Sequence, residues 1–331
     1  MSSEASGQTV AAQTATAQHS LCFVVPCYNE EDALPYFVEA MAKVEGTLSD
    51  RLSRPFTFVF VDDGSADGTL AVLKDLNKRD ERYHYVSFSR NFGKEAGLIA
   101  GLERSLTYDV TDVVVMDVDL QDPPELLGEM LDRMDNEDCD IVATYRESRK
   151  GEPPIRSWFA HRFYGIMNGM SDVEMRDGAR DFRVMRREVV KSICAMPERE
   201  RFSKGLFAWV GFKTEWIGYE NIEREHGQTS WSFMSLTRYA IDGMVAFSKV
   251  PLEALSAIGL LVFAIAIIFL LFILIRAAIF GDPVAGWPSL VCIVTLLSGI
   301  QIFGMGVLGL YLSKIYSEVK GRPHYLVREE R

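Results

Sequence analysis

The sequence predicts an α/β fold with a mostly parallel sheet, followed by a helical hairpin long enough to cross a membrane. Three observations lead to this prediction. Short, continuously apolar runs alternate with helical stretches through the first half of the chain, as expected for strands covered on both faces. Two long stretches near the C-terminus contain no charged residue. The 331 residues suffice for about two structural units.

Five apolar runs are predicted as strands, and four helical stretches separate them. The strands are expected at residues 21–25, 56–61, 83–88, 113–118 and 140–144. The helices are expected at residues 29–48, 69–77, 94–106 and 125–134. The first helix would begin at an Asn29 cap followed by acidic residues, and Asp67 can cap the second. Ligands of such sheets bind beyond the carboxyl ends of the strands.

Residues 254–275 and 283–313 form the two charge-free stretches. Glycines and prolines between them predict a hairpin with spans at about residues 253–276 and 287–313. More basic residues follow the second span than lie in the turn, so the N-terminal region and both termini are expected on the cytoplasmic side of the plasma membrane. Two buried helices of a soluble protein are the alternative, but such helices rarely stay free of charge for so long.

The remaining segments complete the predicted organisation. Residues 1–20 have neither the basic start nor the apolar core of a signal peptide and are predicted as a disordered tail, before a globular domain at residues 21–230. Apolar residues at 3–4 spacing predict an interfacial helix at residues 231–250, although packing on the domain fits the spacing as well. Residues 314–331 are expected to form a basic tail. Small residues in the second span allow close helix contact in a homo-oligomer: Gly299, Gly304, Gly306 and Gly309.

Composition excludes several classes of protein. The net charge of −11 argues against a nucleic-acid partner bound through a basic field. The five cysteines are scattered and form no CxxC pair, which argues against a zinc ribbon or a disulfide framework. No GxGxxG follows the first strand and no GxxxxGK[ST] occurs, which argues against dinucleotide oxidoreductases and P-loop enzymes.

Polar residues follow three of the predicted strands, at the edge where a ligand is expected. Asn29 and Glu30 follow the first, Asp62 and Asp63 the second, and the D-x-D pair Asp117 and Asp119 the fourth. On an extended segment the two carboxylates of the D-x-D pair would point the same way and suit Mg²⁺ or Mn²⁺. Asp62 or Asp63 can accept hydrogen bonds from a base or a ribose, and an Asx turn is the alternative for that pair.

The motifs together resemble the family 2 glycosyltransferases with a GT-A fold. The resemblance is carried by residues 24–31 (VVPCYNEE), 61–65 (VDDGS), 89–94 (SRNFGK) and 117–124 (DVDLQDPP). Residues 180–185 (RDFRVM) and the C-terminal hairpin resemble the polyprenyl-phosphate branch, which includes dolichyl-phosphate mannosyltransferases and bacterial undecaprenyl-phosphate glycosyltransferases. The resemblance covers roughly residues 21–322.

The resemblance implies a role for each matched residue. Asp117 and Asp119 would hold the metal, and Asp119 and Asp181 would act in catalysis, with Asp181 at the position often proposed for a base. The residues implied in binding the nucleotide sugar are Pro26, Tyr28, Glu30, Asp62, Asp63, Lys94, Asp117 and Gln121. The residues implied in binding the phosphate of the acceptor are Arg146, Arg156, Arg162 and Arg183.

The implied reaction is an inverting, metal-dependent transfer of a sugar from a nucleotide-diphosphate sugar, with UDP-glucose favoured, to a polyprenyl phosphate. A lipid phosphate is already anionic at neutral pH, so Asp181 would position groups rather than remove a proton. A flippase and a downstream transferase are the expected protein partners. Two alternatives stay open: transfer to a hydroxyl of a glycolipid or polysaccharide, and a non-catalytic membrane scaffold. The chain lacks the QxxRW motif of processive synthases, which disfavours a polysaccharide.

Overall fold

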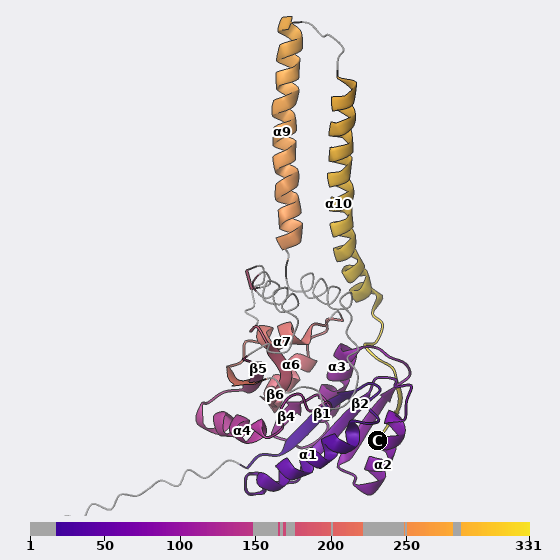
Figure 1. The fold of residues 1–331 in the computed structure, drawn as a ribbon, viewed down its shortest axis with the longest axis vertical. Helices are drawn as coiled ribbons and strands as arrows, with labels where there is room; N and C mark the ends of the chain where they lie inside the picture. Colours follow the sequence, from indigo (N-terminus) through magenta and orange to yellow (C-terminus); the bar gives the residue numbers. More distant parts are fainter. Residues whose placement is uncertain are drawn as a thin grey trace, which may run out of the picture.

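The computed structural model describes residues 18–147, 165, 168–169, 176–199, 201–220, 248, 250–280 and 286–331. They form an α/β domain from which a helical hairpin projects (Figure 1). The described strands form one sheet in the order β7-β5-β6-β4-β1-β2-β3-β8. Their bounds are β1 Leu21–Cys27, β2 Thr57–Asp62, β3 Tyr83–Phe88, β4 Asp112–Val115, β5 Ile141–Arg146, β6 Ala179–Arg186, β7 Thr214–Tyr219 and β8 Val327–Glu330.

The sheet is mostly parallel, which confirms the predicted fold class. Strand β1 pairs in parallel with β2 and β4, and β2 pairs in parallel with β3. Strand β6 is antiparallel to β4 and β5, and β8 is antiparallel to β3. Because β7 is parallel to β5, only β6 and β8 among the described strands run against the rest. Neither of these two, nor β7, is predicted from the sequence.

Helices cover both faces of the sheet, and alternate residues of each strand pack on opposite sides. Phe23 and Val25 of β1 join the core with α1, α2 and α4, whereas Val24 joins the core with α3, α6 and α7. The bounds are α1 Leu34–Thr47, η1 Ser49–Arg51, α2 Thr69–Arg79, α3 Lys94–Ser105, α4 Leu126–Asn136, α6 Arg187–Cys194, α7 Ser203–Trp209, α9 Val250–Phe280 and α10 Trp287–Lys320.

Two predicted elements are wrong at the ends that border the expected site. The first helix begins at Leu34 rather than at Asn29. Asn29 instead adopts a φ of 56°, which asparagine tolerates, and its side-chain oxygen accepts a hydrogen bond from the Ala66 amide. Strand β4 ends at Val115, so Asp117 and Asp119 lie in the following turn and not on an extended segment.

The N-terminal tail also ends earlier than predicted, because His19 and Ser20 are buried. Residues 1–17 lie outside the described part of the chain. Nδ1 of His19 lies 2.8 Å from Oδ2 of Asp112, and Nε2 of His19 lies 3.1 Å from Oδ1 of Asp135. Arg186 contacts the other oxygen of Asp112 at 3.2 Å. This network joins the segment before β1 to β4, α4 and β6.

Replacing His19 with alanine is expected to destabilise the domain by about 3 kcal/mol, because the buried Asp112 loses a partner. The midpoint of thermal unfolding in detergent should fall measurably. Replacing Arg54, which makes an exposed ion pair with Asp109, serves as the control and should change stability by less than about 1 kcal/mol. Equal midpoints for the two variants would contradict this prediction.

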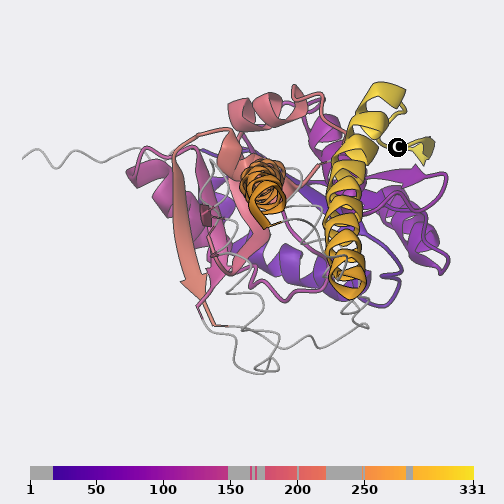
Figure 2. The same cartoon turned by 90° about the horizontal axis from the view of Figure 1, so that it is seen from above.

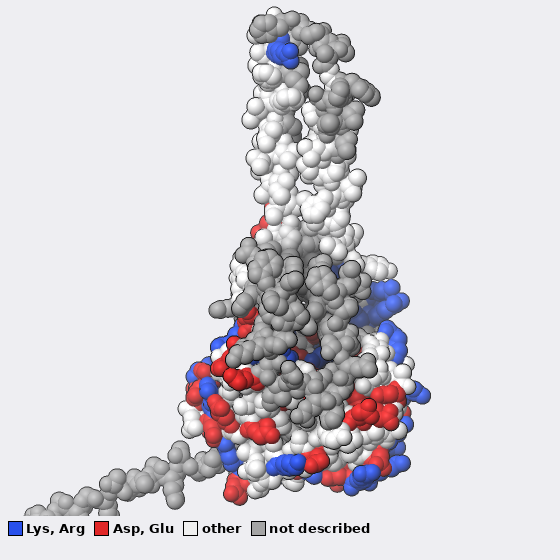
Figure 3. All heavy atoms as spheres, in the orientation of Figure 1, with Lys and Arg blue, Asp and Glu red and all other residues white. Residues whose placement is uncertain are grey.

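Helices α9 and α10 are long and apolar enough to cross a membrane, judged by length and composition. They stand side by side over the domain (Figure 2), where Gly304 of α10 packs against Leu255 of α9. The hairpin surface carries almost no charge, whereas both signs mix over the domain (Figure 3). Of the predicted interfacial helix, residues 231–247 and 249 lie outside the described part of the chain.

The C-terminal segment, predicted as a basic tail at residues 314–331, contains the end of a helix and a strand. Helix α10 continues to Lys320, and β8 then adds to the sheet beside β3. The ring of Tyr325 stacks on Phe88 with centroids 4.8 Å apart, and Lys74 pairs with Glu329 at 2.7 Å. The segment therefore contains, besides its basic residues, the side chains of Tyr325 and Glu329, which contact the domain.

Candidate active site

A lysine joins two carboxylates at the carboxyl end of the sheet. The ammonium nitrogen of Lys94 lies 2.7 Å from Oδ1 and 2.8 Å from Oδ2 of Asp117, and 2.6 Å from Oδ2 of Asp181. Three separate elements supply these groups: the start of α3, the turn after β4, and β6. The side chains are 37%, 25% and 15% exposed respectively, so the cluster is open to a ligand.

Electrostatics distinguishes the two carboxylates. Burial raises the pKa of Asp117, and the neighbouring Asp181 and Asp119 raise it further against the opposing effect of Lys94. Burial also disfavours the charged form of Asp181, but Lys94, Lys204 and Arg183 together hold its pKa well below the ordinary range. Burial would lower the pKa of Lys94, yet the two carboxylates hold it above its ordinary value. The lysine therefore remains a cation at neutral pH.

The turn that carries the D-x-D pair is fixed from two neighbouring strands. Oε1 of Gln121 accepts hydrogen bonds from Arg146 of β5 at 3.2 Å and from Arg180 of β6 at 3.3 Å. The buried Asp122 accepts from Nε of Arg180 at 2.7 Å and from the Tyr219 hydroxyl of β7. Arg180, Asp122 and Tyr219 are not among the predicted site residues, although the first two lie inside the quoted motifs.

Asp63 holds the loop that leads into α3. Its two carboxylate oxygens accept hydrogen bonds from the amides of Phe92 at 2.6 Å and Gly93 at 2.9 Å. Burial raises its pKa, and these two donors oppose the rise. The turn after β2 packs on the same loop. Gly64 in this turn has a φ of 66°, and a Cβ added there would lie 2.3 Å from the carbonyl carbon of Arg90. Only glycine fits there.

Asp62 is used within the protein rather than presented to a ligand. Its oxygens accept from the Ser65 amide at 3.0 Å and from the Ser87 hydroxyl at 2.7 Å, and the side chain is buried. This is the Asx-turn alternative for the acidic pair, and it differs from the predicted contact with the nucleotide. Both acids of the pair thus hold backbone in place: Asp62 closes its own turn, and Asp63 holds the loop before α3.

The first strand brings three more predicted residues to the same edge of the sheet. Pro26, the second-last residue of β1, lies against Gly97 of α3, where an added Cβ would lie 3.6 Å from the Cβ of Pro26. Tyr28 is 46% exposed, and the Glu30 amide donates to the Thr69 hydroxyl at 2.9 Å. An exposed aromatic ring at this edge of the sheet gives a base a surface on which to stack.

The residues present fit a divalent ion bound together with a ligand. Asp117 and Asp119 supply hard carboxylate oxygens, which Mg²⁺ and Mn²⁺ prefer. The described residues include no group of three or more His, Cys, Asp and Glu side chains that could hold a metal ion by themselves. An ion held by the D-x-D pair would therefore need further oxygens from water or from phosphate groups.

The site lies within a segment that a known family matches. The model of the family described as Glycosyl transferase family 2 matches residues 22–194, which include Asp63, Lys94, the D-x-D pair and Asp181. The chain belongs to the family 2 glycosyltransferases. It is therefore an enzyme that transfers hexosyl groups, as the motifs predict, and its fold is the α/β fold expected of that family.

Relatives match this glycosyltransferase over nearly its whole length. The glycosyltransferase CsbB of Bacillus subtilis (strain 168) is 36% identical over 94% of this chain and 92% of its own length. The prophage bactoprenol glucosyl transferase homolog of Escherichia coli (strain K12) is 37% identical over 93% and 98%. The bactoprenol glucosyl transferase of Shigella phage SfX is 36% identical over 94% and 99%. These matches are long enough to include most of the hairpin.

The predicted arginines of the glycosyltransferase have different surroundings. Arg146 reaches Gln121 beside the D-x-D turn. Arg183 is buried, donates to the backbone carbonyls of Asp181 and Arg180, and stacks on Phe207. Burial lowers its pKa to about 10. These contacts differ from the expected contact of Arg183 with an acceptor phosphate and make it a support for β6. Arg156 and Arg162 lie outside the described residues.

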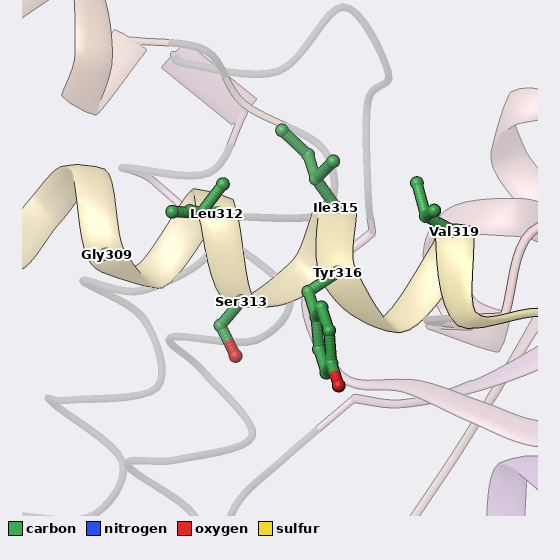
Figure 4. A pocket seen from close by; sticks show the side chains of 6 residues that line it. All are labelled: Gly309, Leu312, Ser313, Ile315, Tyr316 and Val319. Carbon is green, nitrogen blue, oxygen red and sulfur yellow. The ribbon is translucent and has the colours of Figure 1, made fainter.

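An apolar hollow of the transferase lies along α10 (Figure 4). It has a volume of about 560 Å³ and is lined by Gly309, Leu312, Ser313, Ile315, Tyr316 and Val319. All six residues lie in the stretch Leu296–Lys320, which is long and apolar enough to span a membrane. Its chemistry suits hydrocarbon rather than a diphosphate.

Proposed function

We propose that this glycosyltransferase moves a glucosyl group from UDP-glucose to a polyprenyl phosphate at a membrane surface, with inversion of the anomeric carbon. The observation that carries the proposal is the cluster of Lys94, Asp117 and Asp181 at the carboxyl end of the sheet. The names of two relatives, which specify glucosyl transfer to bactoprenol, support the sugar and the lipid. The apolar hairpin supports an acceptor that resides in a membrane.

The site residues divide the work of this reaction. Asp117 and Asp119 would hold Mg²⁺ or Mn²⁺, which stabilises negative charge on the leaving diphosphate when bound. Asp63 and Tyr28 would hold the nucleoside, and the exposure of the Tyr28 ring supports this role. Lys94 adds a positive charge beside the same diphosphate. The lipid phosphate is already anionic, so it can attack in line, in a single displacement that inverts the anomeric carbon.

The fold supports a membrane topology with the catalytic domain and the C-terminus on one side. The chain leaves the domain, passes through α9 and α10, and returns as β8 on the same sheet. Two membrane-spanning helices would bring the chain back to the side on which it started, because an even number of crossings ends on the starting side. The basic residues after α10 favour the cytoplasmic side for both.

A transfer assay in detergent tests the proposal. Purified protein is mixed with undecaprenyl phosphate, Mg²⁺ or Mn²⁺, and each of a panel of radiolabelled UDP- and GDP-sugars. We expect label to enter the organic phase with UDP-glucose and to stay in water when EDTA is added. Lipid label from another donor would correct the sugar. Nucleotide binding without any lipid label would favour a hydroxyl acceptor, and absence of nucleotide binding would favour a scaffold.

The pH dependence of transfer separates a phosphate acceptor from a hydroxyl acceptor. The pKa of Asp181 is held low, so its carboxylate is charged at every pH above its ordinary range and is a weak base. Asp181→Asn should therefore lower the rate by a similar factor, about tenfold to a hundredfold, at each pH between about 6 and 9. If the transfer rate of the wild type instead fell toward low pH and that of the variant did not, Asp181 would be identified as the base that deprotonates a hydroxyl acceptor.

A further inference from the structure

Lys94 occupies the carboxylate that the proposed metal needs. Its ammonium nitrogen faces both oxygens of Asp117, at 2.7 and 2.8 Å. A divalent ion bound by Asp117 would need at least one of the same oxygens. Two cations that close to one carboxylate repel each other strongly, because Coulomb repulsion at a few ångströms outside bulk water is worth several kcal/mol. Lys94 and the metal therefore compete for Asp117.

Asp117 and Asp181 would have different neighbouring charges if Lys94 moved away from them. The pKa of Asp181 is lowered by Lys204 and Arg183 as well as by Lys94, so Asp181 keeps cations nearby. For Asp117 the main group that lowers the pKa is Lys94, whereas Asp181 and Asp119 raise it. Departure of Lys94 would leave Asp117 beside two negative charges, and a divalent ion would restore the balance.

Lys94 is placed so that it can exchange partners. It is the first residue of α3, directly after Gly93, and its side chain is 37% exposed. A lysine carries its charge on a flexible four-carbon stem, so the ammonium group can shift by several ångströms without moving the helix. An anion that enters beside Asp117 from solvent would therefore be within its reach. The diphosphate of the donor is such an anion.

We propose that Lys94 blocks Asp117 from metal in the ligand-free enzyme and moves to a phosphate oxygen when the donor binds. Metal and nucleotide then bind together, because each removes an obstacle to the other. The identity of the anion rests on the proposed function. The consequence is that a free divalent ion binds weakly until a nucleoside diphosphate is present, and that the positive charge of Lys94 ends beside the leaving group.

Binding of Mn²⁺ to the full-length protein in detergent tests this proposal, followed by the electron paramagnetic resonance signal of free Mn²⁺. Wild type should bind Mn²⁺ at least about tenfold more tightly with UDP than without it. Lys94→Met should bind Mn²⁺ about tenfold more tightly than wild type when UDP is absent, and UDP should then add less. Lys94→Met that binds Mn²⁺ no more tightly than wild type without UDP would overturn the proposal.

Two control variants make the comparison specific. Lys94→Arg keeps the charge and should bind Mn²⁺ as weakly as wild type without UDP. Lys204→Met removes a neighbouring lysine whose nitrogen contacts the Ala179 carbonyl at 2.9 Å, and it should leave Mn²⁺ binding without UDP unchanged. If Lys204→Met bound Mn²⁺ as tightly as Lys94→Met, loss of any nearby positive charge would explain the tighter binding of Mn²⁺. That result would also overturn the proposal.

Thermal unfolding guards against a variant that does not fold. Without metal, Lys94→Met should unfold at a lower temperature than wild type, and Mn²⁺ should raise its midpoint more than that of wild type. Lys94→Gln is a second neutral variant, and lack of tighter Mn²⁺ binding in either folded variant counts against the proposal. These measurements contain no sugar and no lipid, so failure of transfer to a polyprenyl phosphate would refute the proposed function without deciding the role of Lys94.

Discussion

Replacement of Asp117 by asparagine is expected to lower the rate of sugar transfer by at least about a thousandfold. Asparagine has nearly the same shape as aspartate but no charge, so it would bind a divalent ion poorly. The variant also loses the strong contact with Lys94, which would then pair with Asp181 alone. We expect a loss in kcat, because the metal stabilises charge that develops as the diphosphate leaves, and a rise in the KM of the donor, because metal and nucleotide bind together.

The control for this prediction is an acid that lies outside the site. Asp109 is fully exposed and pairs only weakly, on the surface, with Arg54. Asp109→Asn should transfer sugar at the wild-type rate. A second variant, Asp119→Asn, should lose activity to a similar degree if both carboxylates hold the ion. Transfer by Asp117→Asn within about tenfold of wild type would rule out a metal held by this carboxylate.

Much of the site can be predicted from the sequence because the fold repeats one simple unit. Each apolar strand is followed by a loop and a helix, and parallel strands bring these loops to one edge of the sheet. Asp63, Lys94 and Asp117 therefore converge although they come from separate loops. No single motif identifies the site by itself. Acidic residues after three neighbouring strands together predict a site for a metal ion and a ligand at this edge of the sheet.

The errors lie where a side chain has two uses that look the same in sequence. Asp62 and Asp63 are adjacent acids after one strand, yet one closes the turn with Ser65 and the other holds the Phe92–Gly93 loop. Their roles depend on which face of the strand end each occupies. The network of Arg180, Asp122 and Tyr219 likewise depends on β6 and β7 lying beside the D-x-D turn.

The antiparallel strands are missed for a related reason. Strand β6 places Asp181 and Arg183 on one face and the buried Phe182 and Val184 on the other. It follows β5 after a long stretch in which the sequence predicts no strand or helix. Strand β8 is short and charged, and it pairs with β3 across more than 200 intervening residues. Pairing at such separation leaves no local signal.

Deletion of residues 322–331 is expected to destabilise the catalytic domain by about 4 kcal/mol and to weaken donor binding at least about tenfold. The deletion removes the β3–β8 ladder, including mutual backbone hydrogen bonds between Tyr85 and Arg331 at 3.1 and 3.0 Å. It also removes the Tyr325 ring from Phe88, and it leaves the β3 edge unpaired. The midpoint of thermal unfolding and the dissociation constant of UDP measure the two effects.

The effect on the donor follows from a chain of contacts that leads from β8 to the site. Tyr325 stacks on Phe88, and Phe88 packs edge-on against Phe92 with centroids 5.8 Å apart. The Phe92 amide donates to Asp63, and Lys94 lies two residues further on. Tyr325→Ala should therefore reproduce part of the loss of UDP affinity while keeping the strand, whereas Arg328→Ala, at an exposed position of β8, should not. Wild-type UDP affinity in Tyr325→Ala would mean that β8 stabilises the sheet without supporting the site.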